Sequence, residues 1–205
     1  MISKSLYIKK TFLCRILTPA FLIFFSTSSV FAVELNNQKL ELSSGKMLFT
    51  LVKTTPAGDS KMTGLANKFS GWMDLQKKTV EITMYVTHQS FQLSGEFKFA
   101  NNRMHETYMH SDKYPTSKYS GTVVSFDPSS GKIKLIGNMS LHGVTKSNFP
   151  IECVYENTKK SDEYLLVCSF TVKLTDFNIE PPDIGLATVD NVVRLKTKFI
   201  MRVVK

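Results

Sequence analysis

Residues 132–146 read KIKLIGNMSLHGVTK and carry the clearest strand pattern in the first two-thirds of the chain. Side chains along a strand point to opposite faces in turn, so residues two apart share a face. The residues of one face here are apolar: Ile133, Leu135, Met139 and Leu141. The preceding segment 127–131 reads DPSSG, which is typical of a hairpin loop. One face of this strand is therefore expected to pack against an apolar interior.

The same alternation recurs on both sides of this stretch. Apolar residues occupy every second position in segments 79–88, 149–157, 164–174 and 193–203. Loops rich in Gly, Pro, Asn and Asp separate eight or nine strand-like segments in all. Short strands with frequent turns, apolar on one face and polar on the other, are typical of a sheet closed around one interior. The pattern predicts an all-β fold, an antiparallel barrel or sandwich, and the alternation favours closure as an eight-stranded β-barrel.

Two segments near residue 100 complete the predicted elements. Gly95–Phe99 is interpreted as a further strand, with Phe97 and Phe99 on one face. A short helix is predicted over about 102–111, with an asparagine at 101 or 102 as its N-cap. Because so short a helix is unstable alone, packing against the barrel must hold it.

The first 32 residues are typical of a secretory signal peptide. Three lysines precede an apolar run that begins at Ile16, and small residues occupy the positions before a cleavage site after Ala32. The run of about ten residues is shorter than the roughly 20 that a spanning helix needs. An uncleaved membrane anchor is the alternative. Cleavage predicts a signal peptide at 1–32 and a single domain at 33–205.

Charge argues against one class of partner. Removal of residues 1–32 would lower the formal net charge from +9 to +5, because four basic residues lie there. No cluster of Lys and Arg is interleaved with aromatic residues, as a nucleic-acid surface requires. No nucleic-acid partner is predicted, whereas a transient contact with a membrane surface and a homodimer are both compatible with the sequence.

Two cysteines remain after such a cleavage, on consecutive strand-like runs. If Asn157 faces Tyr164 across the hairpin, Cys153 lies directly opposite Cys168. Directly opposed residues have Cβ atoms about 4.5–5.5 Å apart, close to the range of a disulfide. A cross-strand disulfide between these residues is predicted, and two buried thiols are the alternative.

The histidines do not form a recognisable catalytic or metal site. His105 and His110 are five residues apart, about 140° round a helix, whereas zinc-protease histidines are four apart on one face. His88 ends an apolar strand face, and a turn-fixing hydrogen bond accounts for His142. No nucleophile is paired with a base in the sequence. No catalytic residue, metal or cofactor is predicted.

The interior is the remaining candidate for function. An eight-stranded barrel can fill its lumen with side chains or leave room for one small ligand, and the sequence alone does not choose. The large residues predicted to point inward are Phe97, Phe99, Met139, Leu141, Tyr155, Phe170, Phe199 and Met201.

Several of these segments resemble the YceI family. The resemblance rests on FKF at 97–99, on MHSDKYP at 109–115, on LHGVTK at 141–146 and on the later LTDF and VDNVVRL. It covers most of residues 46–203. Two features depart from the family's pattern: residues 46–66 have no early His-Ser, and Asn178 stands where many members have Gly.

The resemblance implies an exported, periplasmic protein with a lipocalin-like barrel. It also implies a long apolar ligand in the lumen, a polyisoprenoid or fatty-acid derivative, and a helix near the mouth or side of the barrel. Met104 and Tyr108 on that helix join the candidate lining residues. The implied function is transport or sequestration of a lipid, not catalysis.

Two other readings stay open. One is a structural barrel with a filled core that binds a protein partner by its exposed face. The other, ranked lowest, is an enzyme acting on a lipid-like substrate, with His142 or His110 as acid–base. A continuous void between the inward rows would favour the lipid-binding reading over the filled barrel.

Overall fold

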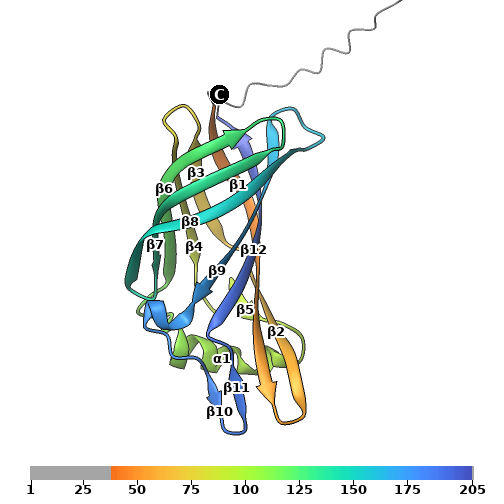
Figure 1. The fold of residues 1–205 in the computed structure, drawn as a ribbon, viewed down its shortest axis with the longest axis vertical. Coiled ribbons are helices and arrows are strands. Elements are labelled where there is room, and N and C mark those ends of the chain that lie inside the picture. The colour runs from red at the N-terminus through yellow and green to blue at the C-terminus, as the bar shows by residue number, and fades with distance from the viewer. Residues whose placement is uncertain (1–37, 205) are drawn as a thin grey trace, which may run out of the picture. The chain divides into compact units, whose positions relative to one another are not determined.

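The computed structural model describes residues 38–204, and the side chains of all of these except Asp183 and Ile184. The predicted signal peptide therefore lies outside the described residues. Figure 1 shows the arrangement of the elements. The strands are β1 (Lys39–Thr55), β2 (Gly58–Ala66), β3 (Phe69–Asp74), β4 (Thr79–Tyr85), β5 (Phe91–Leu93), β6 (Thr116–Asp127), β7 (Lys132–Leu141), β8 (Val144–Asn157), β9 (Glu163–Lys173), β10 (Asp183–Ile184), β11 (Ala187–Val189) and β12 (Val192–Val203). The helical segments are η2 (Gly95–Ala100), α1 (Asn101–Arg103), η3 (Met104–Tyr108) and η4 (Leu174–Phe177).

Eight antiparallel strands close into a barrel, as predicted. Each pairs with the next in the order β1, β12, β9, β8, β7, β6, β4 and β3, and pairing of β3 with β1 closes the ring. The inward rows are those expected from the alternation. On β12, for example, Val193, Thr197, Phe199 and Met201 are buried, while the lysines and arginines between them are exposed. When strands with alternating apolar and polar residues close into a barrel, each strand buries its apolar face.

The hairpin turns explain why the strands pair as they do. The loop between β7 and β8 has two residues, His142 and Gly143, with φ angles of 51° and 76°. Two consecutive left-handed residues make a type I′ turn, whose twist matches that of the flanking strands. Between β6 and β7, the Asp127 carboxylate accepts hydrogen bonds from Ser129 and Ser130. These bonds hold the pKa of Asp127 down, at about 2.

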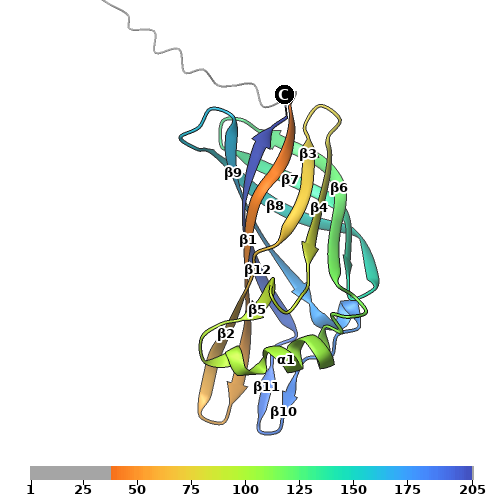
Figure 2. The ribbon, with the colours of Figure 1, turned by 180° about the vertical axis from the view of Figure 1, so that it is seen from behind.

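Part of the chain extends beyond the ring at one end, called here the lower end. Strand β1 continues past the barrel and pairs with β2, which in turn pairs with β5. The short hairpin of β10 and β11 attaches to the same part of β1. Figure 2 shows the helical segment crossing this end beside the two hairpins. Both β1 and β12 reach the opposite, upper end, where Lys39 and Val203 lie.

The prediction for residues 95–99 is wrong. These residues form the 3₁₀ helix η2, which runs directly into α1 and the π-helical η3. Gly95, at φ 63°, turns the chain out of β5. With three residues per turn, residues two apart in a 3₁₀ helix lie about 120° apart around the axis, so Phe97 and Phe99 do not share a face. Phe97 is buried, and Phe99 is 86% exposed.

The predicted short helix exists, but its bounds and cap differ. Helical structure begins at Gly95 and ends at Tyr108, rather than spanning 102–111. Neither asparagine is the N-cap: Ala100 precedes α1, and the Asn101 side chain instead accepts from the Leu93 amide and donates to the Leu93 carbonyl. Those two bonds tie the helix to β5 and so fix it across the lower end.

Strands β8 and β9 pair in the predicted register. Asn157 lies opposite Tyr164, and Cys153 opposite Cys168, with the two sulfur atoms bonded at 2.06 Å. Asn178, which stands where many members of the YceI family have Gly, can also be placed. Asn178 takes the left-handed conformation at the end of η4, with φ 54°. Asn is the non-glycine residue that adopts this conformation most readily, so the replacement keeps the turn.

Candidate functional site

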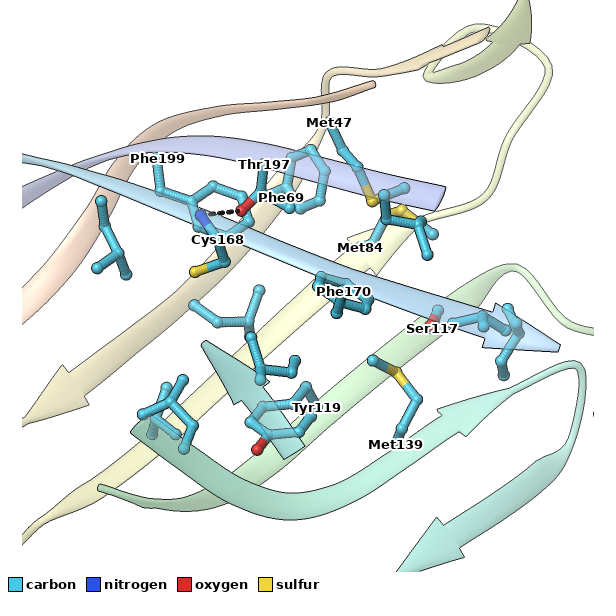
Figure 3. A pocket seen from close by; sticks show the side chains of 18 of the residues that line it. Met47, Phe69, Met84, Ser117, Tyr119, Met139, Cys168, Phe170, Thr197 and Phe199 are labelled. Carbon is cyan, nitrogen blue, oxygen red and sulfur yellow. Dashed lines mark hydrogen bonds between the residues drawn. The ribbon is translucent and has the colours of Figure 1, made fainter. Parts of the chain in front are cut away.

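The barrel encloses a small apolar cavity with a volume of about 100 Å³. All eight ring strands contribute to its lining, and Figure 3 shows side chains from facing strands, including Tyr119 and Phe170, pointing into it. The lining residues are Met47, Phe69, Met73, Val80, Ile82, Met84, Ser117, Tyr119, Leu135, Met139, Leu141, Ile151, Leu166, Cys168, Phe170, Val172, Leu195, Thr197 and Phe199. The barrel interior is thus mostly filled, with a narrow void left along it.

The few polar groups of this cavity are bonded to the protein itself. The Tyr119 hydroxyl donates to the Phe149 carbonyl, and the Ser117 hydroxyl donates to the Ser140 carbonyl. The Thr197 hydroxyl accepts from the Cys168 amide. Burial raises the pKa of Tyr119 to about 12, which keeps the phenol neutral. Since these polar groups already have hydrogen-bond partners in the protein, a hydrocarbon chain in the cavity would leave none of them unsatisfied.

A larger cavity of about 330 Å³ lies at the lower end. Its walls come from the β1–β2 hairpin, β5, the helical segment and the chain around β11 and η4. The lining residues are Met47, Phe49, Leu51, Lys53, Met62, Met84, Phe91, Leu93, Phe97, Phe99, Ala100, Arg103, Met104, Tyr108, Met109, Leu141, Val172, Leu174, Ile179, Pro182, Val189, Val193 and Leu195. Most of the void therefore lies at the lower end of the barrel ring, with the helical segment as one of its walls.

The two cavities adjoin at a constriction. Five residues line both: Met47, Met84, Leu141, Val172 and Leu195. Along β9 the combined lining runs from Leu166 to Val172, six residue steps that span about 20 Å at 3.3 Å per residue. We call the two cavities and their junction the tunnel. Its length and width suit an extended hydrocarbon chain better than a compact molecule.

The upper end of the barrel is packed. Leu40, Ile133, Tyr164 and Met201 are all buried there, and none of them lines either cavity. The lower cavity, by contrast, reaches the surface, because Phe99 lines it and is 86% exposed. The tunnel is thus closed above and has its mouth beside η2 and α1.

Two cationic side chains line the lower cavity near this mouth. The Lys53 ammonium lies 5.5 Å from the centre of the Phe97 ring, and the Arg103 guanidinium lies 5.8 Å from the centre of the Tyr108 ring. Such cation–π contacts hold the charged groups over aromatic faces. A ligand that fills the tunnel would end among these side chains.

The structure brings most of the predicted lining residues together. Met139, Leu141, Phe170 and Phe199 line the upper cavity. Leu141 also lines the lower cavity, with Phe97, Phe99, Met104 and Tyr108. Tyr155 and Met201 line neither, because both belong to the packed region above the tunnel: Tyr155 lies against Phe126 and Tyr164, and Met201 is buried.

Sequence reasoning missed much of the lower cavity. Met47, Phe49, Leu51 and Lys53 all point into it, and their spacing of two is visible in the sequence. Of the methionines in the lining, Met104 and Met139 were predicted and the other five were missed. Seven of the nine in the chain line the tunnel: Met47, Met62, Met73, Met84, Met104, Met109 and Met139. Flexible thioether side chains let a wall adapt to what it contacts.

The four histidines form two pairs beside the helical segment. His105 is 1% exposed; its Nδ1 lies 2.6 Å from the Ser111 hydroxyl and its Nε2 lies 2.7 Å from the Phe91 carbonyl oxygen. The His88 ring lies against it, tilted by 31° with the ring centroids 4.1 Å apart, and burial holds the pKa of His105 below its usual value.

The second pair is His110 and His142, whose ring nitrogens lie 2.8 Å apart. His142 is buried and its Nδ1 faces the Phe177 carbonyl, so it fixes a turn as expected, although it does not lie on an exposed polar face. Neither histidine lines the tunnel. Among residues 38–204, no third His, Cys, Asp or Glu joins either pair in a metal-binding group.

No helix in residues 38–204 has the length and apolar character needed to cross a membrane.

Comparisons with known proteins agree with this geometry. The fold matches a polyisoprenoid-binding domain from Saccharophagus degradans implicated in plant cell wall breakdown, with 10% identity, a TM-score of 0.61, and coverage of 82% of this chain and 100% of that one. It also matches BcnA of Burkholderia cenocepacia, with 13% identity, a TM-score of 0.55, and coverage of 74% of this chain and 95% of that one. A third match is a YceI protein of Campylobacter jejuni, with 17% identity, a TM-score of 0.54, and coverage of 69% of this chain and 84% of that one. At these identities the likeness shows the fold alone.

A search of curated sequences found no match. The model of one domain family, described as the YceI-like domain, matches residues 34–201 and so covers all of the barrel except the last two residues of β12. The chain therefore belongs to the YceI-like family.

Proposed function

We propose that this protein binds a long apolar lipid of the polyisoprenoid or fatty-acid type in the tunnel, with the chain pointing toward the packed upper end. The observation that carries the proposal is a largely apolar lining shared by two adjoining cavities, closed above and open below, in which the polar groups of the upper cavity are already bonded to the protein. The family and the polyisoprenoid-binding neighbour support the same ligand class.

The volume supports useful affinity. Filling apolar cavities changes free energy by about 24 cal/mol per Å³, so occupation of the 330 Å³ cavity is worth about 8 kcal/mol before the cost of ordering the ligand. With no such cost this would correspond to a Kd near 1 μM, which is therefore the tightest binding that filling this cavity alone would give. Pockets that bind small molecules have volumes of about 300–1,000 Å³, and this cavity falls at the lower end of that range. The methionine-rich wall can yield further as a chain enters.

The role we assign is carriage or sequestration of this lipid after export, with residues 1–32 as the signal peptide and the periplasm as the location. The mouth is suited to brief contact with a membrane. Phe99 and Leu186, both 86% exposed, lie at the lower end, the end at which a ligand would leave. Exposed large apolar side chains beside a lipid channel are the kind that insert into a bilayer surface. We assign no reaction to the protein, because the His110–His142 pair lies outside the tunnel.

The test is removal and return of the ligand. The protein is extracted with organic solvent, refolded, and titrated with a fluorescent acyl or prenyl probe. The proposal expects saturable uptake of one probe per chain and displacement by unlabelled long-chain lipid. A refolded barrel that takes up no apolar probe would contradict it and would favour the filled barrel that binds a partner.

A further inference from the structure

The charged side chains at the tunnel mouth are positive. Of the described side chains that line either cavity, Lys53 and Arg103 are the ionisable groups that carry charge at neutral pH, and both are cationic. The described lining of the upper cavity contains no charged residue. An opposite charge at the mouth would therefore meet two cations and no competing carboxylate among the described side chains of the wall.

Neither cation is neutralised by the protein. Among the described side chains, the ion pairs involve other residues, and neither Lys53 nor Arg103 belongs to one. Acidic residues do occur nearby in sequence: Glu106 follows Arg103 by three residues on the helix, and Asp190 follows the residue that pairs with Lys53. Neither of these carboxylates forms an ion pair with the two cations.

The aromatic contacts position these cations. Lys53 lies over Phe97 and Arg103 over Tyr108, and both rings are part of the same wall. A lysine or arginine that only needed solvation would extend into water. Instead, the two charges are held at the boundary between the apolar lining and solvent, where the polar end of a lipid must stop.

We propose that the lipid carries an anionic head group, a phosphate or carboxylate, bound by Lys53 and Arg103. The inference rests on the proposed function, because it concerns the end of a chain that the tunnel would hold. Arg presents paired donors to two oxygens of a carboxylate or phosphate, and Lys adds a point charge. A neutral alcohol would leave both charges without a counterion.

The experiment compares three lipids with one chain length: hexadecanol, hexadecyl phosphate and palmitate, each below its aggregation threshold. The proposal expects the protein to bind at least one of the anionic lipids about tenfold or more tightly than hexadecanol, a ratio typical of a charge-assisted contact. The better of the two anions identifies the head group. The preference should shrink at high salt, because the mouth is exposed to solvent.

A double variant, Lys53→Met with Arg103→Met, should abolish the preference, so that neither anion binds more tightly than hexadecanol. The matched control is Lys61→Met with Lys98→Met, which removes the same net charge from the same end but from residues outside the lining. The control should keep the preference. Circular dichroism and thermal melting report that each variant is folded.

The outcomes separate the two claims. If hexadecanol binds as tightly as both anions, or if the control variant loses the preference as much as the test variant, the head-group assignment is overturned and lipid binding stands. If none of the three lipids binds, the proposed function fails, and the head-group inference fails with it.

Discussion

The constriction gives the sharpest prediction. Val172 is buried and lines both cavities where they meet, so Val172→Phe should place a ring across the junction. The upper cavity of about 100 Å³ would then be cut off from the lower one. At about 24 cal/mol per Å³, its occupation is worth about 2.4 kcal/mol, or a factor of about 60 in Kd.

The assay is a chain-length series of saturated alcohols, measured by calorimetry or by displacement of a fluorescent probe. In the wild type, affinity should rise with each methylene until both cavities are filled. In Val172→Phe the rise should stop at a shorter chain, and the longest chains should lose about 60-fold. Chains too short to pass the constriction should bind the two proteins equally.

The matched control is Val167→Phe, the same substitution on the same strand at a position between two inward residues, and so on the outer face. An unfolding measurement should accompany both variants, because an added ring in a packed region costs about 1–3 kcal/mol of stability. If Val172→Phe binds the longest chains as tightly as the wild type, the chain does not pass this junction. Equal losses for long and short chains would likewise refute a tunnel in two sections.

Three further predictions concern stability. Replacing Cys153 and Cys168 by Ser should lower the free energy of unfolding by about 3 kcal/mol in denaturant titrations, since the bond closes a 15-residue loop; equal stability with and without reductant would contradict this. Gly64→Ala should cost about 1–3 kcal/mol, because its Cβ would sit 2.0 Å from the Phe49 ring and 2.5 Å from a backbone oxygen; an unchanged melting temperature would be incompatible with that packing. Burial lowers the pKa of His105, so the stability that its neutral ring contributes should be complete above pH 6.5, the ordinary pKa, and be lost as the pH falls through the lowered pKa of the folded protein. Melting temperatures measured against pH test this, and the prediction is contradicted if His105→Gln has the same pH dependence as the wild type.

The barrel was predictable because strand signals are local. Alternation on β12 and β9 fixed which residues point inward, and counting across the β8–β9 hairpin fixed the register of Cys153 with Cys168. Both depend on a period of two and on turn chemistry, which neighbouring residues determine.

The lower cavity was not predictable in the same way, because its parts come from distant segments. The helical conformation of 95–100 depends on Gly95 and on the tie between Asn101 and Leu93, and no local alternation reveals that tie. The FKF motif at 97–99 has strand spacing, yet the residues are helical: both rings line the lower cavity, Phe97 buried and Phe99 exposed at its mouth. Tyr155 fits the inward pattern equally well, but its position near the packed end keeps it off the tunnel.

The central claim is that the tunnel holds a lipid, and native mass spectrometry of the protein purified from its own host tests it most directly. The account predicts a species heavier than the chain by the mass of one long-chain lipid, which organic extraction removes. A single unliganded mass, from a protein that also takes up no lipid when one is supplied, would contradict it.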